Sequence, residues 1–414
     1  NNAWQNTALF GNLILKGKTA DSVTGKDPYK LLSFINSIYR KYNRDDYKNF
    51  DIVEEAIIAA KAVAADKDST QEDYDEQYAN LQSVLSQLEY TEEAAKVKRF
   101  TEMPGAYKGT CTSGGVIETL SYEIKVKTAD GTETTETKYL NVYLPYGNDP
   151  EAVKYNVLYL MHGGGENWQT IFGGPGEERE LKRILDNMIA NGDIDPMIVV
   201  TPSFGNSFDF NTFAKEELLN QIIPLVESKY STYAAALSTT GSAISTAYSE
   251  LSTSDDVVST TGSAITLDVI KATRGHRAFG GFSMGSACTW AVLANCIDYV
   301  KYYIPLSGGH WSFAGDNPAE QANAMAEFLA DHNMGPRDFF ILGATGSADI
   351  AYPGMKPWMD ALKEHGDPFI FNKDLTTGNC YFMVGENGTH AWNFINQYLY
   401  NILPDLSYLF SSEP

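Results

Sequence analysis

The sequence predicts an α/β protein in which a small all-helical N-terminal domain precedes a doubly wound, mostly parallel sheet. Two observations lead to this expectation. Residues up to about 97 carry apolar side chains at helical spacing, and from about 105 onward short apolar runs alternate with helical segments. The later runs are nearly continuous, as in strands that are buried on both faces of a parallel sheet. We therefore expect one domain at 1–97 and a second at 98–414.

The first domain is predicted to contain three amphipathic helices. The first follows Asp27-Pro28, the second covers about 51–66, and the third has an apolar stripe that runs from Tyr74 to Leu88. Ser69 and Glu72 have the spacing of a capping box at the start of the third helix. The stripes favour packing of the helices on one another over cofactor binding. Residues 50–90 also resemble FIVAR-type repeats, which are accessory modules of bacterial cell-surface and secreted carbohydrate-active proteins.

The second domain is expected to begin with a hairpin and to continue with buried strands. Residues 119–126 and 139–144 have the pattern of half-exposed strands, with a turn at Ala129-Asp130-Gly131-Thr132. Buried strands are expected at 157–161, 197–200, 278–280, 302–306, 339–342 and 381–384. Helical segments such as 215–230 and 391–402 separate most of them, which implies right-handed crossovers.

The segment 232–272 is an insertion rich in Ser, Thr and Ala. Residues 238–244 and 259–265 repeat the sequence Ser-Thr-Thr-Gly-Ser-Ala-Ile, but two copies build no solenoid. The insertion leads into the N-terminal end of the strand at 278–280. Ligands bind at the opposite edge of such a sheet, so we do not expect the insertion to act as a lid.

Composition argues against several classes of protein. Of 414 residues, 43% are hydrophobic and 12% aromatic, which is enough for a folded core. The formal net charge of −22 opposes binding to nucleic acid or to an anionic membrane surface. No stretch approaches the roughly 18 apolar residues of a membrane span. The chain starts at Asn1 and not at a methionine, so we expect that an upstream segment such as a signal peptide has been removed.

Four cysteines are too few to staple a chain of this length. Cys288 and Cys296 lie on one predicted helix with roughly 12 Å of rise between them, which is too far for a disulfide. Whether Cys111 and Cys380 pair is open at this stage, and so is the redox compartment.

A candidate nucleophile lies at Gly281-Phe282-Ser283-Met284-Gly285, between the apolar run 278–280 and the apolar segment 286–293. This is G-x-S-x-G between a strand and a helix. Flanking glycines allow a sharp turn that exposes the serine hydroxyl in a strained conformation. The helix that follows points its N-terminus at an oxyanion formed there.

A serine hydroxyl needs a general base, and in this arrangement the base follows the acid in the chain. Four histidines follow Ser283. His310 and His332 precede the candidate acid, and His365 has the pattern of a solvent-facing helix end. We therefore predict His390, in a glycine-containing loop between a strand and a helix, as the base.

Asp349 is the predicted acid, because it lies in the loop that leaves the C-terminal end of the strand at 339–342. Asp338 precedes that strand and belongs to the opposite edge. Glu386, close to His390 in the sequence, is the alternative.

The oxyanion requires two backbone N–H donors. Met284, directly after the serine, is one candidate. The other is Gly164, with Gly165 as the alternative, in the loop 162–168 after the first buried strand; glycines let this backbone approach a substrate carbonyl closely. We expect His162, at the end of that strand, to be structural.

The chain from about 105 to 405 resembles the feruloyl esterases of carbohydrate esterase family one, which are esterase D-like members of the α/β-hydrolase fold. The motifs that carry the resemblance are Leu160-Met161-His162-Gly163-Gly164-Gly165, Gly280-Gly281-Phe282-Ser283-Met284-Gly285, Pro305-Leu306-Ser307-Gly308, Gly343-Ala344-Thr345-Gly346 with Asp349, and Gly388-Thr389-His390-Ala391-Trp392. The resemblance implies hydrolysis of ester-linked hydroxycinnamates, such as ferulate on arabinoxylan, without cofactor or metal. It also implies a secreted or cell-surface bacterial protein with a polysaccharide or oligosaccharide substrate, and flanking modules in a longer protein.

The sequence departs from this family at three places. Ser286 stands where many relatives carry glycine, and relatives usually lack so long an insertion at 232–272. His310 precedes Trp311 where an acidic residue is common, which leaves the acyl specificity open.

Substrate contacts are expected from Trp168, Trp311 and Trp392, each of which follows the C-terminal end of a predicted strand, and from His310. Within the same chemistry, the alternatives are an acetyl xylan esterase or another small-acyl carboxylesterase. The alternative from a different class is a non-catalytic carbohydrate or cell-surface binding protein.

Overall fold

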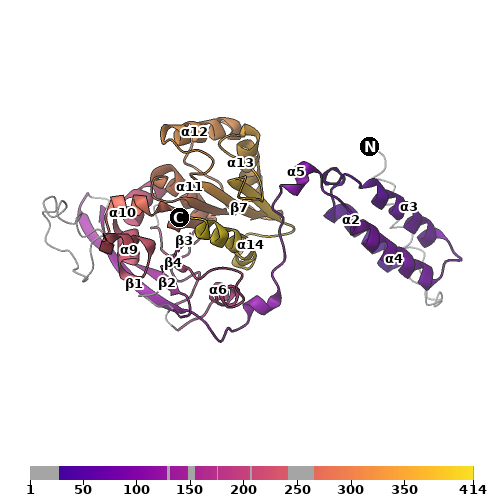
Figure 1. The fold of residues 1–414 in the computed structure, drawn as a ribbon, viewed down its shortest axis with the longest axis horizontal. Helices are drawn as coiled ribbons and strands as arrows, with labels where there is room; N and C mark the ends of the chain where they lie inside the picture. The colour runs from indigo at the N-terminus through magenta and orange to yellow at the C-terminus, as the bar shows by residue number, and fades with distance from the viewer. Residues whose placement is uncertain are drawn as a thin grey trace. The chain divides into compact units, whose positions relative to one another are not determined.

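The computed structural model describes residues 28–127, 131–147, 154–174, 176–205, 208–240 and 265–413 (Figure 1). The chain divides into two compact units, Asn1–Lys96 and Val97–Pro414. Most of the predicted insertion, residues 241–264, lies outside the described residues, and so do Asp27 and the first two residues of the predicted hairpin turn, Ala129 and Asp130.

The first unit is helical. Its helices are α2 (Tyr29–Lys41), the 3-10 turn η1 (Arg44–Asp46), α3 (Asp51–Ala65), α4 (Gln71–Leu85) and the short α5 (Glu92–Ala95). The apolar stripes form one core, which includes Leu31, Ile35 and Ile38 of α2, Val53 and Ile57 of α3, and Tyr74 and Leu81 of α4. Tertiary packing of these faces is what stabilises helices of this length.

The capping box of α4 lies one residue later than the sequence pattern predicted. The Thr70 hydroxyl accepts the Asp73 N–H at 3.2 Å, and the Asp73 carboxylate accepts the Thr70 N–H at 2.6 Å. The predicted pair, Ser69 and Glu72, has the same spacing, so spacing alone does not decide between them. Ser69 is instead buried.

The second unit is built on one eight-stranded sheet with the order β1-β2-β4-β3-β5-β6-β7-β8. The strands are β1 (Val116–Lys127), β2 (Glu133–Leu144), β3 (Val157–Met161), β4 (Ile198–Thr201), β5 (Arg277–Phe282), β6 (Tyr302–Leu306), β7 (Phe340–Gly346) and β8 (Cys380–Gly385). β1 and β2 are antiparallel to their neighbours, and β3 to β8 are all parallel. The predicted doubly wound, mostly parallel sheet is confirmed.

Helices cover both faces of this sheet (Figure 1). α6 (Glu180–Ala190) and α14 (Trp392–Ser411) pack on one face; the π-helical η3 (Phe213–Ile222), α8 (Ile223–Lys229), α11 (Met284–Cys296), α12 (Pro318–Asp331) and α13 (Tyr352–His365) pack on the other. The strands alternate accordingly: Leu158 and Leu160 face the first helix layer, and Tyr159 faces the second. The shorter elements are η2 (Gly105–Lys108), α7 (Phe210–Thr212), α9 (Tyr233–Thr240), α10 (Leu267–Ala272) and η4 (Arg274–His276).

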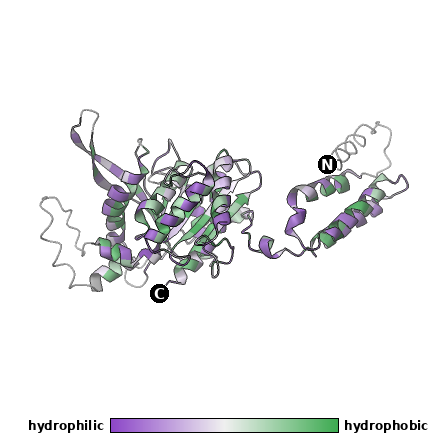
Figure 2. Cartoon of the chain, turned by 90° about the horizontal axis from the view of Figure 1, so that it is seen from above, coloured by the Kyte–Doolittle hydropathy of each residue, from purple (hydrophilic) through white to green (hydrophobic). Residues whose placement is uncertain are grey.

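The hairpin of β1 and β2 is longer than predicted. The half of the hairpin nearest the turn is hydrophilic (Figure 2), and in β2 this half is exposed whereas the half that joins the sheet is buried. The outer half of β2 consists of threonines and charged residues, and the apolar signal for a strand is missing. Antiparallel pairing with β1 continues nonetheless, from Val116↔Leu144 to Lys127↔Glu133, because the β-branched threonines suit a strand.

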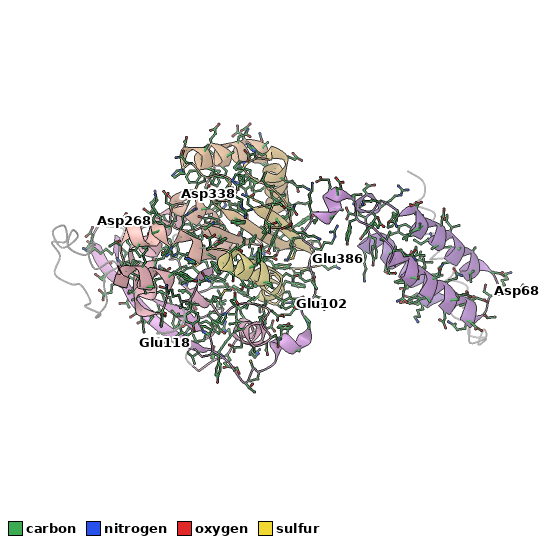
Figure 3. The ribbon with its side chains drawn as sticks, viewed as in Figure 1. Asp68, Glu102, Glu118, Asp268, Asp338 and Glu386 are labelled. Carbon is green, nitrogen blue, oxygen red and sulfur yellow. The ribbon has the colours of Figure 1, made fainter. Side chains whose placement is uncertain are left out.

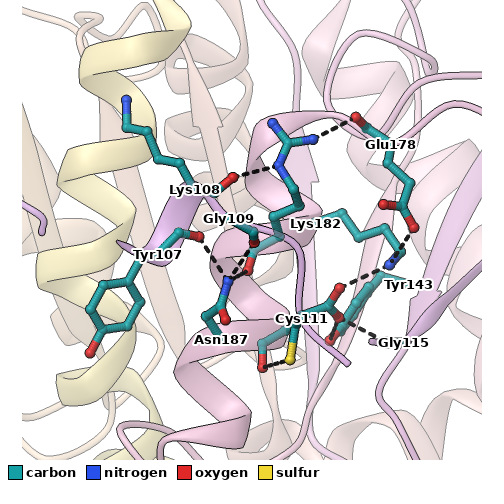
Figure 4. A network of polar contacts seen from close by, with 11 residues as sticks. Tyr107, Lys108, Gly109, Cys111, Gly115, Tyr143, Glu178, Lys182 and Asn187 are labelled. Atoms are coloured by element: carbon teal, nitrogen blue, oxygen red, sulfur yellow. Dashed lines mark hydrogen bonds and ion pairs between the residues drawn. The ribbon is translucent and has the colours of Figure 1, made fainter. Parts of the chain in front are cut away.

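A polar network fastens the segment before β1 to α6 (Figure 4). The buried Asp186 carboxylate accepts the Gly115 N–H at 2.7 Å, the Tyr143 hydroxyl at 2.9 Å and the Lys182 ammonium at 2.8 Å. Cys111 lies in the same network, with its Sγ 3.7 Å from the carbonyl oxygen of Asp186. Cys111 and Cys380 are both free thiols, so the structure does not pair them.

A buried ion pair lies at the N-terminal edge of the sheet. Nε and Nη2 of Arg277 donate to the two carboxylate oxygens of Glu227, at 2.6 and 2.7 Å. Both side chains are almost fully buried. Glu227 also accepts the Tyr159 hydroxyl at 3.0 Å. Removing one partner of such a pair leaves an uncompensated charge in the protein interior.

Replacing Glu227 with Ala is therefore expected to lower the free energy of unfolding by about 3–5 kcal/mol. Urea unfolding followed by tryptophan fluorescence measures the change. Asp298→Ala is the matched control, because it breaks the exposed Lys271–Asp298 pair of the same unit and is expected to have little effect. Equal losses in the two variants would contradict the assignment.

Candidate active site

Ser283 lies on a sharp turn between β5 and α11, with φ 58° and ψ −114°. A non-glycine residue at positive φ is strained, and strain of this kind gathers at functional sites. The backbone packs tightly around the turn: a Cβ on Gly281 would lie 2.4 Å from the Gly285 carbonyl oxygen, and one on Gly285 would lie 2.6 Å from that of His162. Both positions therefore require glycine, as the G-x-S-x-G pattern predicted.

The structure brings the three predicted side chains together in one hydrogen-bonded chain. Ser283 Oγ lies 2.9 Å from His390 Nε2, and His390 Nδ1 lies 2.7 Å from Asp349 Oδ1. The three residues follow β5, β7 and β8, whose C-terminal ends meet at the same edge of the sheet. This is the geometry that a nucleophile, its base and an orienting acid require.

The Asp349 carboxylate is suited to orient His390. Burial alone would raise its pKa, but hydrogen bonds from His390 and from the Ala351 N–H outweigh burial and hold the pKa below its usual value. An ionised carboxylate only accepts hydrogen bonds, so Nδ1 of His390 must carry the proton. The lone pair of Nε2 is then free to accept the proton of Ser283.

The alternative acids lie elsewhere. Asp338 precedes β7 and accepts the Gly335 N–H at 2.9 Å, and Glu386 follows β8 and is exposed. Figure 3 labels both residues and shows them well apart, with Glu386 at the right margin of the second unit and Asp338 near its upper middle. Among the described residues, neither carboxylate makes a hydrogen bond or an ion pair with His390, whose partners are Asp349 and Ser283. His365, the alternative base, ends α13 and packs its ring against Phe369.

The two predicted oxyanion donors lie side by side. A Cβ on Gly164 would be 2.9 Å from Met284 Cγ, so the loop after β3 touches the first residue of α11. The Met284 N–H has no acceptor within its own helix. Among the described residues, no hydrogen bond takes up the Gly164 N–H. Gly165, the alternative donor, has φ 74°, a backbone conformation that glycine adopts readily.

His162 orients the peptide that carries the Gly164 N–H. Its Nδ1 lies 2.7 Å from the Gly163 carbonyl oxygen and its Nε2 lies 2.7 Å from Ser203 Oγ. A carbonyl only accepts, so Nδ1 is protonated, and burial lowers the pKa of the ring and keeps it neutral. The C=O of Gly163 and the N–H of Gly164 belong to one planar trans peptide and point in opposite directions. The Gly164 N–H therefore points away from the imidazole.

The residues predicted to contact substrate do not form one cluster. Trp311 is 65% exposed and stacks on Phe210 at 5.6 Å between ring centroids. Trp168 packs against Tyr139, and His310 packs against Trp358. The Trp392 indole N–H donates to Glu166 Oε1 at 2.8 Å, so this ring is held by the protein.

Sequence reasoning assigned no role to four residues near the site. Phe208 and Phe210 lie in the segment after β4; the buried Phe210 packs against Trp311, and the exposed Phe208 packs against Phe210. Their clustering in Ser-Phe-Asp-Phe was the available signal. Glu166 was part of the predicted oxyanion loop but had no role assigned to it. Ser286, one of the family departures, donates its hydroxyl to the Gly308 carbonyl at 2.9 Å and so fills the position usually held by glycine.

Comparison with known proteins gives related esterases and xylanases. Endo-1,4-beta-xylanase Y of Acetivibrio thermocellus is 40% identical over 308 residues, which are 74% of this chain and 24% of that protein. Among solved structures, one named FAE is 39% identical with a TM-score of 0.60, and the match covers 75% of this chain and 94% of that one. A serine-to-alanine mutant of the feruloyl esterase module from Clostridium thermocellum, complexed with sinapinate, is 38% identical with a TM-score of 0.58 and the same coverage.

No protein-family model matches the chain. A second curated relative, the endo-1,4-beta-xylanase/feruloyl esterase of Xylanibacter ruminicola, is 38% identical over 114 residues, which are 24% of this chain and 15% of that protein. The chain thus spans about a quarter or less of the length of the curated relatives that it matches.

The strained serine turn predicts a difference between two variants that both lack the hydroxyl. Glycine adopts φ 58° without strain, whereas alanine keeps the Cβ. Ser283→Gly is therefore expected to be more stable than Ser283→Ala by about 1 kcal/mol. This difference is the backbone strain that glycine releases minus the extra conformational entropy that glycine gives the unfolded chain. Thermal unfolding of the two variants measures the difference, and a less stable glycine variant would contradict the assigned strain.

Proposed function

Because the chain belongs to the feruloyl esterases, the family that its motifs resemble, we propose that it is a serine esterase acting on feruloyl and other hydroxycinnamoyl esters of plant cell-wall polysaccharides such as arabinoxylan. The observation that carries the proposal is the hydrogen-bonded chain from Ser283 through His390 to Asp349, next to two N–H groups at Gly164 and Met284. This arrangement has the parts that acyl transfer to a serine needs.

In the proposed acylation step, Ser283 Oγ attacks the ester carbonyl while His390 Nε2 takes its proton. The Asp349 carboxylate stabilises the imidazolium that forms. The N–H groups of Met284 and Gly164 donate to the tetrahedral oxyanion, whose charge they stabilise more strongly than the neutral carbonyl. The C–O bond to the sugar then breaks, and His390 returns the proton to the departing sugar hydroxyl.

Deacylation repeats the steps with water. His390 removes a proton from the water as it attacks the acyl-Ser283 carbonyl, and the same N–H groups hold the second oxyanion. Collapse of this intermediate breaks the bond to Ser283 Oγ, which regains its proton from His390 and releases the hydroxycinnamate.

An aromatic acyl group fits the exposed indole of Trp311 better than an acetyl group does. One face of this indole stacks on the buried Phe210, and Phe208, 41% exposed, packs against Phe210 as well. Offset stacking on such rings adds binding energy for an aromatic acyl group that an acetyl group cannot obtain. We assign the acyl contact to Trp311. Trp168 is proposed to contact the sugar. Trp392 and His310 are proposed to shape the substrate-binding site through their contacts with other side chains.

The proposed setting is a bacterial protein, secreted or at the cell surface, in which further modules flank this chain. Support comes from the curated relatives, which are xylanases several times longer than the matched part. The first unit is proposed to be an accessory module. The net charge of −22 disfavours nucleic acid and anionic lipid as partners. Within the described residues, no helix combines the length and apolar character of a membrane span.

A small-acyl esterase would use the same residues, so only substrate preference separates it from the proposal. The kcat/KM for methyl ferulate, set against that for 4-nitrophenyl acetate, measures this preference. A non-catalytic binding protein is disfavoured because the hydrogen-bonded chain is complete. A fluorophosphonate probe, which labels activated serines, would leave an inert protein unmodified.

Ser283→Ala tests the proposed nucleophile. Loss of the hydroxyl is expected to reduce turnover of methyl ferulate by at least about 10⁴-fold, because the covalent route is then closed. Circular dichroism is expected to be unchanged, since only the Oγ atom is removed. Retained turnover by the variant would contradict the assignment.

Trp311→Ala tests the aromatic acyl surface. The kcat/KM for methyl ferulate is expected to fall by about 10-fold, with a much smaller change for 4-nitrophenyl acetate, which has no acyl ring to stack. Tyr408→Ala is the matched control, because it removes an exposed aromatic ring on α14. Equal effects of Trp311→Ala on the two substrates would exclude Trp311 as the acyl contact.

A further inference from the structure

Glu166 joins two segments of the candidate site through a single carboxylate. Its Oε2 accepts the Gly163 N–H at 2.7 Å, and its Oε1 accepts the Trp392 indole N–H at 2.8 Å. Gly163 precedes the proposed oxyanion donor Gly164 in the loop after β3. Trp392 is the first residue of α14 and follows His390 by two positions. One side chain therefore connects the oxyanion loop with the segment that carries the base.

The space between these two segments is filled by Phe282, the residue before the nucleophile. A Cβ on Gly163 would lie 3.3 Å from Phe282 Cδ1 and 3.4 Å from Ser283 Cβ. On its other side, the Phe282 ring packs against His390 at 4.6 Å and Trp392 at 5.2 Å between ring centroids. Gly163 lies against both Phe282 and Ser283. A shift of Gly163 would therefore change the distance between the oxyanion loop and Ser283.

Gly163 is held at both of its backbone polar groups. Glu166 accepts its N–H, and His162 donates to its carbonyl oxygen. With both neighbouring peptide planes fixed, the direction of the Gly164 N–H is fixed as well. Oxyanion stabilisation depends on donors that are aimed before the charge develops, and a displacement of about 1 Å costs on the order of 100-fold in rate.

We propose that Glu166 is a positioning residue for the reaction, and that its carboxylate holds the Gly164 donor and the His390 base at matched distances from Ser283. This inference rests on the proposed serine esterase function. A carboxylate suits the task because it only accepts hydrogen bonds and has an oxygen for each of the two donors. Glutamine would turn an NH2 group toward one of the donors.

The expected signature is a loss in kcat without a loss in substrate binding. For methyl ferulate, Glu166→Gln is expected to lower kcat by about 10-fold and Glu166→Ala by about 30- to 100-fold, with KM within about 2-fold of wild type, because the oxyanion donor acts in the transition state. Trp392→Phe keeps the ring and removes the N–H, and is expected to lower kcat by several-fold. Added to Glu166→Ala, it should cause no further loss, since both changes break the same bridge.

Inhibition by a trifluoromethyl ketone analogue of ferulate distinguishes a positioning role of Glu166 from a purely structural one, which would leave the Ki unchanged. The analogue forms a tetrahedral adduct with Ser283 whose oxyanion sits between the two N–H donors. Its Ki is expected to rise in the Glu166 variants by the same factor as kcat/KM falls. Glu177→Gln is the matched control: Glu177 accepts the Gly174 N–H at 3.2 Å with the same spacing of three residues but has no link to Trp392. It is expected to leave both quantities unchanged.

The results of these experiments distinguish a failure of the proposed role of Glu166 from a failure of the proposed esterase function. A wild-type protein without turnover of methyl ferulate would contradict the proposed function. An active wild type with Glu166→Gln and Glu166→Ala indistinguishable from Glu177→Gln would overturn the role of Glu166 alone. A rise in KM with unchanged kcat would also overturn it, by making Glu166 a substrate-binding group. The near-isosteric Gln variant preserves the fold, so its kinetics decide the matter even where the Ala variant is destabilised.

Discussion

The backbone turn at Ser283 is the constraint around which the second unit is organised. The serine sits at positive φ, and its N–H is fixed by the Leu306 carbonyl at 2.9 Å. The next loop packs directly on it, because a Cβ on Gly308 would lie 2.4 Å from the Ser283 carbonyl oxygen. A strained turn persists only when its surroundings over-determine it. Here β5, α11 and the loop after β6 do so together, and the serine hydroxyl is held against His390 as a result.

The parallel sheet carries the other groups to that hydroxyl. β7 and β8 pair in register from Ile341↔Cys380 to Gly346↔Gly385, so the loops that follow them begin at the same level. The two loops are then tied by the backbone bond from the Ala348 N–H to the Gly388 carbonyl at 3.0 Å. Asp349 and His390 follow this contact directly. Rigid strands with polar loops at one edge thus set distances that no local sequence interaction would maintain.

The sequence predicted the features that depend on chain order and strand ends, and it missed those that depend on side-chain direction. Ser283, Asp349 and His390 were predicted because each follows a recognisable strand, and the strands in the structure match the predicted ones closely. Trp392 was assigned to the substrate by the same rule, yet its N–H is bound by Glu166. A strand-end position gives the edge of the sheet but not the way a ring points. The capping box at Thr70 and the long hairpin were missed because spacing and apolar pattern leave more than one solution.

We propose that the geometry around Ser283 makes its hydroxyl the acyl acceptor. Rapid mixing with 4-nitrophenyl ferulate, followed by acid quench and peptide mass spectrometry, tests it most directly. We expect an initial burst of 4-nitrophenolate close to one equivalent per protein chain, with the feruloyl mass on the peptide that contains Ser283. A feruloyl adduct on another residue, or steady turnover that passes through no acyl-protein, would contradict it.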